Sequence, residues 1–267
     1  MVAEGLLRAG ENLGARARAH FSNEVSGVGA GASYSAREYL MNGLLYALEP
    51  RQPIAMLHEI SWLTGLWVMN QGDPQSSPVT SEVFRTAATK FWGSDKAWDL
   101  NTHEGKAVAA VKIIDRTYAK DSLLLCDSVW PLMVSWNTPD HVGDPTLESR
   151  LFSAVTGIDT DETELNQYGE RIFNLERCVL LREGWRPKID DVPAEFNFVD
   201  PVETVFMNPE VIVPGPGEEV ISRKGQTLDR QVFAEMRREF YELRGWDSES
   251  GLQKAETLER LGLSDLV

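Results

Sequence analysis

Cysteine is scarce in this chain of 267 residues, which contains only Cys126 and Cys178. The two cysteines form neither a CxxC pair nor the even, closely spaced set that marks a disulfide framework. Such sparing use is typical of proteins in the reducing cytosol, where disulfides are rare. We therefore expect a cytoplasmic protein whose fold depends on a packed core rather than on cross-links.

Basic residues are also in the minority. The chain has 26 Lys and Arg against 41 Asp and Glu, which gives a net charge of −15. No block of basic residues interrupts this acidity. Nucleic acids and anionic membrane surfaces attract basic patches, so we expect neither of them as a partner.

Long apolar runs are missing as well. A helix that spans a bilayer needs about 20 predominantly apolar residues, and no run in this sequence reaches that length. The first residues, Met1 to Gly5, lack the basic start and the long apolar core of a secretory signal. The sequence therefore predicts neither a membrane span nor secretion.

What the sequence does contain is helical periodicity. Hydrophobic residues make up 42% of the chain and charged residues 25%, which is typical of a globular protein. Apolar residues recur at three- and four-residue spacing, so we expect a mainly α fold with little strand. The predicted helices cover residues 3–20, 35–48, a segment after Pro53, 80–93, a segment after Thr102, 144–157, 161–179, 228–243 and 252–261. The proline-rich stretch 186–225 is expected to be a long irregular loop with a short strand at Val220-Ile221.

Several helix ends can be predicted from single residues. Thr80 and Thr102 each precede a helical segment and are the residue type that caps helix N-termini. Asp144-Pro145 predicts a helix start, because proline suits the first helical position. Gly93 and Gly157 are predicted to end their helices.

The strongest predicted helix begins at Asp161, where Glu164 completes a capping box. Gly169 lies in mid-helix, where glycine costs about 1 kcal/mol relative to alanine, so we expect another segment to pack closely against it. An apolar stripe is expected to face the core; it consists of Leu165, Tyr168, Ile172, Leu175 and Val179.

A second, polar stripe on the same helix consists of Glu170, Asn174 and Arg177. Their i, i+4, i+7 spacing places them on one face. A solvated face is the commoner meaning of such a stripe, and a functional face is the alternative.

One short segment carries the residue types of a cofactor site. Asp121 offers a carboxylate that can accept hydrogen bonds from amino-bearing rings, and Cys126 offers a soft metal ligand. Both could reach one cofactor if the segment starts a helix. The structural alternative, which composition alone favours, makes Asp121 a helix N-cap and Cys126 a small buried hydrophobe. Residues 123–134 are mostly apolar and are expected to be buried all round.

The C-terminal part of the chain carries a series of motifs in a fixed order. The motifs are Gly169-Glu170-Arg171-Ile172-Phe173-Asn174-Leu175-Glu176-Arg177, Arg182-Glu183-Gly184, Asp190-Asp191-Val192-Pro193, Tyr241-Glu242-Leu243-Arg244-Gly245-Trp246-Asp247 and Leu258-Glu259-Arg260-Leu261-Gly262-Leu263. This series resembles the C-terminal helical part of the aldehyde ferredoxin oxidoreductases. Those proteins are tungsten, or sometimes molybdenum, bis-pyranopterin enzymes with a [4Fe–4S] cluster.

The resemblance implies roles for individual residues. The family's Asp-x-x-Gly-Leu-Cys pattern matches Asp121 to Cys126, so Asp121 and Leu125 are expected at the pterin and Cys126 as the fourth cluster ligand. The family's glycine is replaced by Leu124, although glycine would let the backbone approach the cofactor. The family also has a histidine near the metal; His58 is our candidate for it, with His103 as the other choice, while a lone histidine is more often a core or boundary residue.

The chain also departs from the family. The other cluster cysteines lie in an upstream CxxCxxxC motif that this sequence lacks, and one cysteine cannot hold a four-iron cluster. We also expect the family's N-terminal β domain to be missing from this chain. We therefore expect a fragment, a split subunit or a degenerate homologue, with a partial helical domain over 1–100 and a C-terminal helical domain over 101–267. Its expected partners are an N-terminal cofactor-binding domain or chain, and ferredoxin.

The resemblance implies oxidation of an aldehyde to a carboxylate, with electrons leaving through the pterin and the cluster to ferredoxin. One alternative is reduction of aromatic acyl-CoA thioesters, which another branch of the family performs. A second alternative is a non-catalytic helical interaction subunit that has lost the cofactor.

Overall fold

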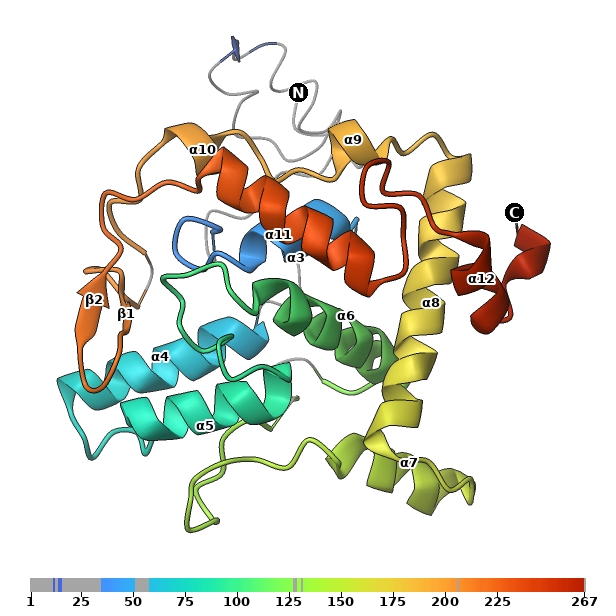
Figure 1. The fold of residues 1–267 in the computed structure, drawn as a ribbon. Coiled ribbons are helices and arrows are strands. Elements are labelled where there is room, and N and C mark those ends of the chain that lie inside the picture. The colour runs from blue at the N-terminus through green and yellow to red at the C-terminus, as the bar shows by residue number, and fades with distance from the viewer. Residues whose placement is uncertain are drawn as a thin grey trace.

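The computed structural model describes residues 12, 14–15, 35–50, 58–126, 129–130, 132–205 and 207–266, without the side chains of His58 and Leu266. This part of the chain is mainly helical, as predicted, and its one sheet has two strands (Figure 1). The helix predicted over 3–20 falls almost wholly outside the described residues. No helix within the described ranges is long and apolar enough to cross a membrane.

The elements follow one another along the chain, and the longest connection between two of them runs from the end of α6 to the start of α7. They are α3 (Asn42–Leu48), α4 (His58–Gly72), α5 (Ser81–Trp92), α6 (Lys106–Ser122), α7 (Leu147–Thr156), α8 (Glu162–Arg182), α9 (Pro187–Asp190), α10 (Phe196–Val199), β1 (Ile212–Pro214), β2 (Val220–Ser222), α11 (Arg230–Leu243), α12 (Ala255–Arg260) and the 3₁₀ turn η3 (Ser264–Leu266). The strands pair antiparallel, which confirms the strand predicted at Val220-Ile221. The proline-rich stretch is therefore more ordered than predicted, because it holds two short helices and this hairpin.

Helix ends that depend on local chemistry are confirmed. The Thr80 hydroxyl accepts the backbone N–H of Val83 at 3.2 Å, and Gly93 ends α5 with φ +70°. Asp161 and Glu164 form the capping box of α8. These interactions join residues three positions apart, so the sequence alone determines them.

Several predicted helix starts are wrong. The helix predicted from about Ser35 begins at Asn42. Thr102 does not cap α6, which begins four residues later at Lys106 because Gly105 adopts φ +73° and interrupts the helical path. The next helix does not begin at Pro145 either. The Asp144 carboxylate accepts both the backbone N–H and the hydroxyl of Thr146, at 3.0 and 2.7 Å, and this tight turn delays α7 to Leu147.

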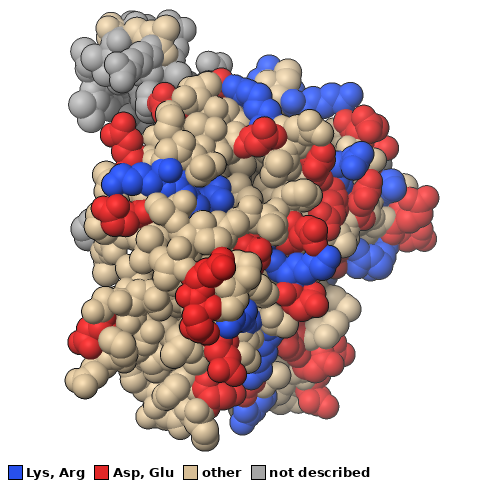
Figure 2. Space-filling model, turned by 60° about the vertical axis from the view of Figure 1, so that its left-hand side comes forward, with Lys and Arg blue, Asp and Glu red and all other residues tan. Residues whose placement is uncertain are grey.

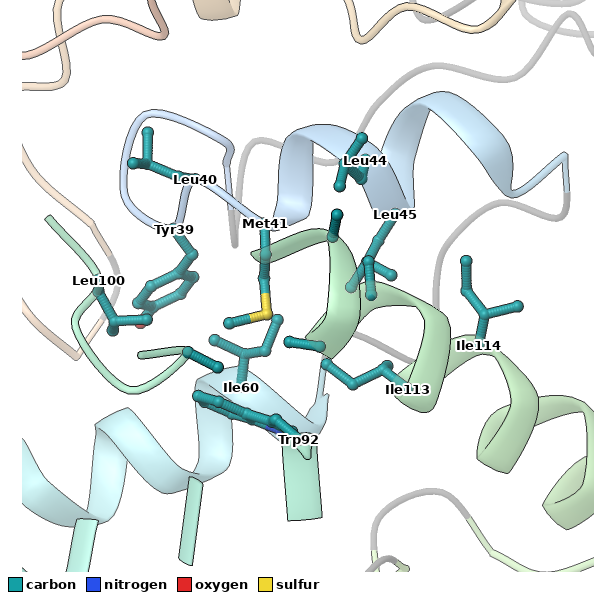
Figure 3. Close-up of a cluster of buried hydrophobic side chains, with 14 of the residues drawn as sticks. Tyr39, Leu40, Met41, Leu44, Leu45, Ile60, Trp92, Leu100, Ile113 and Ile114 are labelled. Atoms are coloured by element: carbon teal, nitrogen blue, oxygen red, sulfur yellow. The ribbon is translucent and has the colours of Figure 1, made fainter. Parts of the chain in front are cut away.

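One hydrophobic core occupies the space between α3, α4, α5, α6 and α11. Figure 3 shows Met41 from the segment before α3, Ile60 from α4, Trp92 from α5 and Ile113 from α6 pointing toward one another. Each of these side chains is completely buried. The core takes residues from both sides of position 100, and the division into domains at that position stays a prediction.

The close approach predicted at Gly169 is confirmed. A Cβ atom built on this residue would lie 1.9 Å from the Asp115 backbone oxygen. Glycine therefore lets α8 cross α6 with the two main chains in contact (Figure 1).

The face of α8 that lies inward is only partly the predicted one. Leu165 is buried and Ile172 packs against the core, as predicted. The other three members of the expected stripe point outward: Tyr168, Leu175 and Val179 are 48%, 40% and 49% exposed. The inward face follows an i±4 ridge that passes through Gly169. The other members of this ridge are Leu165, Phe173 and Arg177. The contact of Gly169 with α6 decides the rotation of α8, and polar residues of this ridge are buried in consequence.

The charged surface has no basic block on the face that Figure 2 shows, where acidic and basic side chains stand beside one another. Exposed ion pairs among the described residues include Lys96 with Glu104 at 2.5 Å and Lys224 with Glu210 at 3.3 Å. Exposed pairs of this kind contribute little to stability because water and salt screen them.

Candidate functional site

The segment from Asp121 to Cys126 lies where α6 ends, not where a helix starts. Asp121 is in the last turn of α6, so both the predicted N-cap and the predicted helix start at this residue are wrong. The side chain of Asp121 is about one-third exposed, and its Oδ1 is 3.9 Å from Nζ of the buried Lys120. The Asp121 carboxylate is therefore partly exposed at the C-terminal end of α6, with the Lys120 ammonium group close to it.

The chain leaves α6 through a Schellman motif. The N–H of Leu125 donates to the carbonyl of Lys120, and the N–H of Leu124 donates to the carbonyl of Asp121, each at 3.1 Å. Leu124 occupies the left-handed position of this motif, with φ +57°, and its side chain is 91% exposed. Glycine is the residue this position favours, so the glycine expected from the family pattern has a reason in the backbone itself.

Cys126 follows directly on the surface. It is a free, exposed thiol, so the alternative of a buried hydrophobe is wrong for this residue. Its carbonyl accepts the N–H groups of Val129 and Trp130, each at 3.0 Å, which turns the chain back after the thiol. Leu124 and Val129 are more than half exposed, and Leu132 is 37% exposed. The predicted complete burial of 123–134 is therefore wrong for most of the described residues there, and the thiol stands in an exposed apolar loop.

A buried ion pair lies beneath this segment, and sequence reasoning missed it. Arg116 on α6 pairs with the completely buried carboxylate of Glu59 on α4. The same guanidinium donates to the Phe91 carbonyl at 2.9 Å and lies 5.0 Å from the centre of the Phe91 ring. Burial raises the pKa of Glu59, and Arg116 opposes that rise. The only sign of this pair in the sequence was that Arg116 and Glu59 each lie at a core position of a helical pattern.

The motifs of the C-terminal part converge on a second buried network. Arg177 donates to both carboxylate oxygens of Asp191, at 2.8 and 2.5 Å, and both side chains are almost completely buried. Trp185 Nε1 and the Tyr241 hydroxyl donate to the same carboxylate at 2.7 and 2.5 Å. Burial raises the pKa of Tyr241, and the neighbouring Asp191 raises it further. Asp191 is thus held by three donors from separate segments.

Asn174 extends this network. Its Oδ1 accepts from Trp246 Nε1 at 2.9 Å and from Gln253 Nε2 at 2.6 Å. The Arg177 guanidinium lies 4.8 Å from the centre of the Trp246 ring. Asn174 and Arg177 are at most 1% exposed, so a solvated face is wrong for these two members of the polar stripe.

A third group of motif residues joins α6, α8 and α11. Arg244 donates to Asp115 at 2.5 Å and lies over the rings of Phe173 and Phe240, at 4.9 and 5.2 Å. Burial raises the pKa of Asp115 to about 6, although Arg244 lowers it. These contacts hold helices together, so this set of motif residues is structural.

The order of these motifs also identifies the family. A sequence model described as aldehyde ferredoxin oxidoreductase, domains 2 & 3, matches residues 1–263. The chain belongs to the aldehyde ferredoxin oxidoreductase family. Because the match is to the second and third domains, it implies an accompanying N-terminal domain.

The described residues supply only part of what the family's cofactors need. Within the described ranges, no three His, Cys, Asp or Glu side chains gather closely enough to hold a metal ion. Cys178 is buried beside Leu258 and Leu261, and its thiol donates to Gln253 Oε1 at 3.1 Å. Because a [4Fe–4S] cluster takes four thiolates, this part of the chain fits one ligand position through Cys126 and not the cluster as a whole.

The candidate histidine stays a prediction. His58 is the first residue of α4, and its side chain lies outside the described part of the structure. The other choice, His103, places Nε2 3.8 Å from Glu235 Oε2 in a half-exposed pair. Neither observation tests a role near the metal, so the assignment of His58 rests on the sequence alone.

Proposed function

We propose that this chain is the cofactor-facing C-terminal portion, or a split subunit, of a tungsten or molybdenum pterin oxidoreductase that oxidises aldehydes to carboxylates. Electrons would pass through a [4Fe–4S] cluster to ferredoxin or a similar carrier. The observation that carries the proposal is the exposed segment at the end of α6. It presents a carboxylate at Asp121 and a free thiol at Cys126, the two groups that the family pattern matches to its cofactors.

Each residue of the segment has a proposed task. Asp121 would accept hydrogen bonds from ring N–H and amino groups of the pterin, since an ionised carboxylate is an acceptor only. Leu125 would give the pterin an apolar contact. Cys126 would supply one thiolate to the cluster. His58 would hold or transfer a proton near the metal. The bound cofactors would supply the two-electron chemistry itself.

The remaining ligands would come from an N-terminal cofactor-binding domain or chain. The apolar residues next to the thiol in the sequence support such a contact, since Leu124 is 91% exposed and Val129 is 54% exposed. Exposed apolar residues that gather around a functional group are typical of an interface. We also propose that the chain divides near position 100 into a partial helical domain and a C-terminal helical domain, and that the second of these carries the cofactor-facing segment.

A second candidate function is a non-catalytic helical interaction subunit. Two observations favour it: leucine stands at the left-handed position where the family has glycine, and the described residues offer a single cluster ligand. In this case the buried networks around Asp191 and Asp115 would preserve the fold without the chemistry.

The test is the metal content of the natively purified protein with whatever polypeptide co-purifies. Iron and labile sulfide near four per chain, together with tungsten or molybdenum and a partner, are the expected result. Cys126→Ser should remove iron and sulfide while the partner still co-purifies. Cys178→Ser is the matched control, because that thiol is buried away from the segment, and it should leave the metal content unchanged.

Two outcomes would contradict the catalytic proposal. A metal-free species of 29.9 kDa with no partner would leave the interaction subunit as the better account. Equal iron content in the wild type and in Cys126→Ser would show that Cys126 is not a cluster ligand, even if the complex is active.

A further inference from the structure

A narrow cavity lies between α6, α7 and α8, next to the buried Glu59–Arg116 pair. Its volume is about 10 Å³, which is the size that holds one water molecule and nothing larger. Its main lining side chains are Arg116, Lys120, Glu148, Glu162, Leu165 and Asn166. Four of these six side chains are charged and one is an amide, so the wall offers polar partners to a water molecule.

Two polar atoms in the wall of this cavity are unsatisfied. Glu148 Oε1 and Asn166 Nδ2 are both buried, and neither has a hydrogen-bond partner among the described residues. The two residues are only 4% and 8% exposed. One atom is an acceptor and the other is a donor, so a single water molecule can satisfy both. Buried polar atoms without a partner are rare in native proteins because each one costs free energy.

We propose that one ordered water molecule binds in this cavity. It donates a hydrogen bond to Glu148 Oε1 and accepts one from Asn166 Nδ2. Its second lone pair is open to a donor from the cationic wall that Arg116 and Lys120 form. Three or four polar partners is the usual number for a buried water molecule.

The bound water joins three helices. Glu148 belongs to α7, Asn166 to α8 and the cationic wall to α6. Arg116 also places Nη2 3.9 Å from Glu162 Oε1, so α6 and α8 meet here through charge as well. Burial raises the pKa of Glu148, and a water molecule that donates to this carboxyl reduces that desolvation. The water site does not depend on any cofactor and therefore stands apart from the proposed function.

The direct test is a high-resolution crystal structure of the whole chain. The expected result is electron density for one water molecule about 2.7–3.2 Å from both Glu148 Oε1 and Asn166 Nδ2. An empty cavity, or a direct hydrogen bond between the two side chains, would overturn the proposal. This test uses the wild-type protein and decides the question even if a variant fails to fold.

Substitutions provide the second test. Asn166→Leu removes the donor without changing the volume much, and it should lower Tm by about 3–10 °C, since the water and Glu148 then lose a partner. Gln167→Leu replaces the next amide along α8, which is exposed, and should change Tm by less than about 1 °C. The double variant Glu148→Leu with Asn166→Leu should lose less than the sum of the single variants, because no polar atom remains unsatisfied. Additive losses, or equal Tm values for Asn166→Leu and Gln167→Leu, would contradict the water bridge.

Discussion

A single left-handed residue defines how the chain leaves α6. Leu124 holds φ +57° at the position of the Schellman motif that favours glycine, and this conformation costs a residue with a Cβ about 1–2 kcal/mol. The side chain is 91% exposed, so it recovers little of that cost through burial. The departure from the family pattern at this residue is therefore a local cost to stability and leaves the turn intact.

Replacing Leu124 should reveal that cost. We expect Leu124→Gly to raise the free energy of unfolding by up to about 1 kcal/mol, because relief of the left-handed strain exceeds the added entropy of the unfolded glycine. Leu123→Gly is the matched control at φ −85°, where there is no such strain, and it should lower the same quantity by about 1 kcal/mol. Urea denaturation of the two variants measures both changes. A loss in Leu124→Gly equal to that in Leu123→Gly would show that the turn is relaxed with leucine.

At the scale of elements, the crossing of α6 and α8 depends on one missing side chain. Gly169→Ala would place a methyl group 1.9 Å from the Asp115 carbonyl oxygen, which is backbone and cannot turn away. We expect a loss of at least about 1–3 kcal/mol of unfolding free energy, despite the better helix propensity of alanine. Gly65→Ala in α4 is the control, since nothing lies within 4 Å of a Cβ there, and it should gain up to about 1 kcal/mol. Similar unfolding free energies for the two variants would mean that α6 and α8 can move apart to admit the methyl group without a loss of stability.

The Asp191 network makes the second prediction at this scale. Asp191→Asn leaves the buried Arg177 guanidinium without a charged partner, so we expect a loss of about 3–5 kcal/mol of unfolding free energy. Glu195→Gln is the control. Glu195 and its partner Arg230 are both about half exposed, and the expected loss is below about 1 kcal/mol. Chemical denaturation distinguishes the two, and an equal loss would argue that the Arg177 pair is no stronger than the surface pair.

The elements also show what the sequence could and could not predict. The capping box at Asp161 was predictable because its partners are three residues apart. The rotation of α8 was not, since periodicity reveals two stripes and the contact at Gly169 decides which one faces inward. The burial of Arg177 depends on Asp191, which is far enough along the chain that spacing alone gives no pairing. Asp121 was assigned to a helix start because the apolar residues after it suggested a new helix, and leucine at position 124 concealed the glycine signal for a helix end.

At the scale of the whole molecule, net charge and the burial of carboxyl groups both lower the free energy of unfolding as pH rises. The net charge of −15 makes self-repulsion grow as carboxyl groups ionise. Burial also raises the pKa of Glu38 to about 7 and that of Asp115 to about 6. A carboxyl whose pKa is higher in the folded state binds more protons there, so its contribution to stability is present below its unfolded pKa and is lost as pH rises through its folded pKa.

We therefore expect the free energy of unfolding to decrease between about pH 4.5 and pH 7. Glu38→Gln removes the titrating group while keeping its size and polarity, and it should flatten this decline by up to about 3 kcal/mol. Glu183→Gln, at an exposed position, serves as the control and should leave the pH profile unchanged. Urea denaturation at several pH values measures the slope. Stability that rises from pH 5 to pH 7 would contradict the assignment of raised pKa values.

The contact between Gly169 and Asp115 has a consequence for how the sequence can change over time. Two helices that touch through their main chains have a separation that no side chain sets. Substitutions elsewhere on α6 and α8 can therefore accumulate without moving one axis relative to the other. The end of α6, with Asp121 and the turn that follows it, keeps its place through such drift, and a chain whose surfaces have diverged widely would still present that segment in the same position.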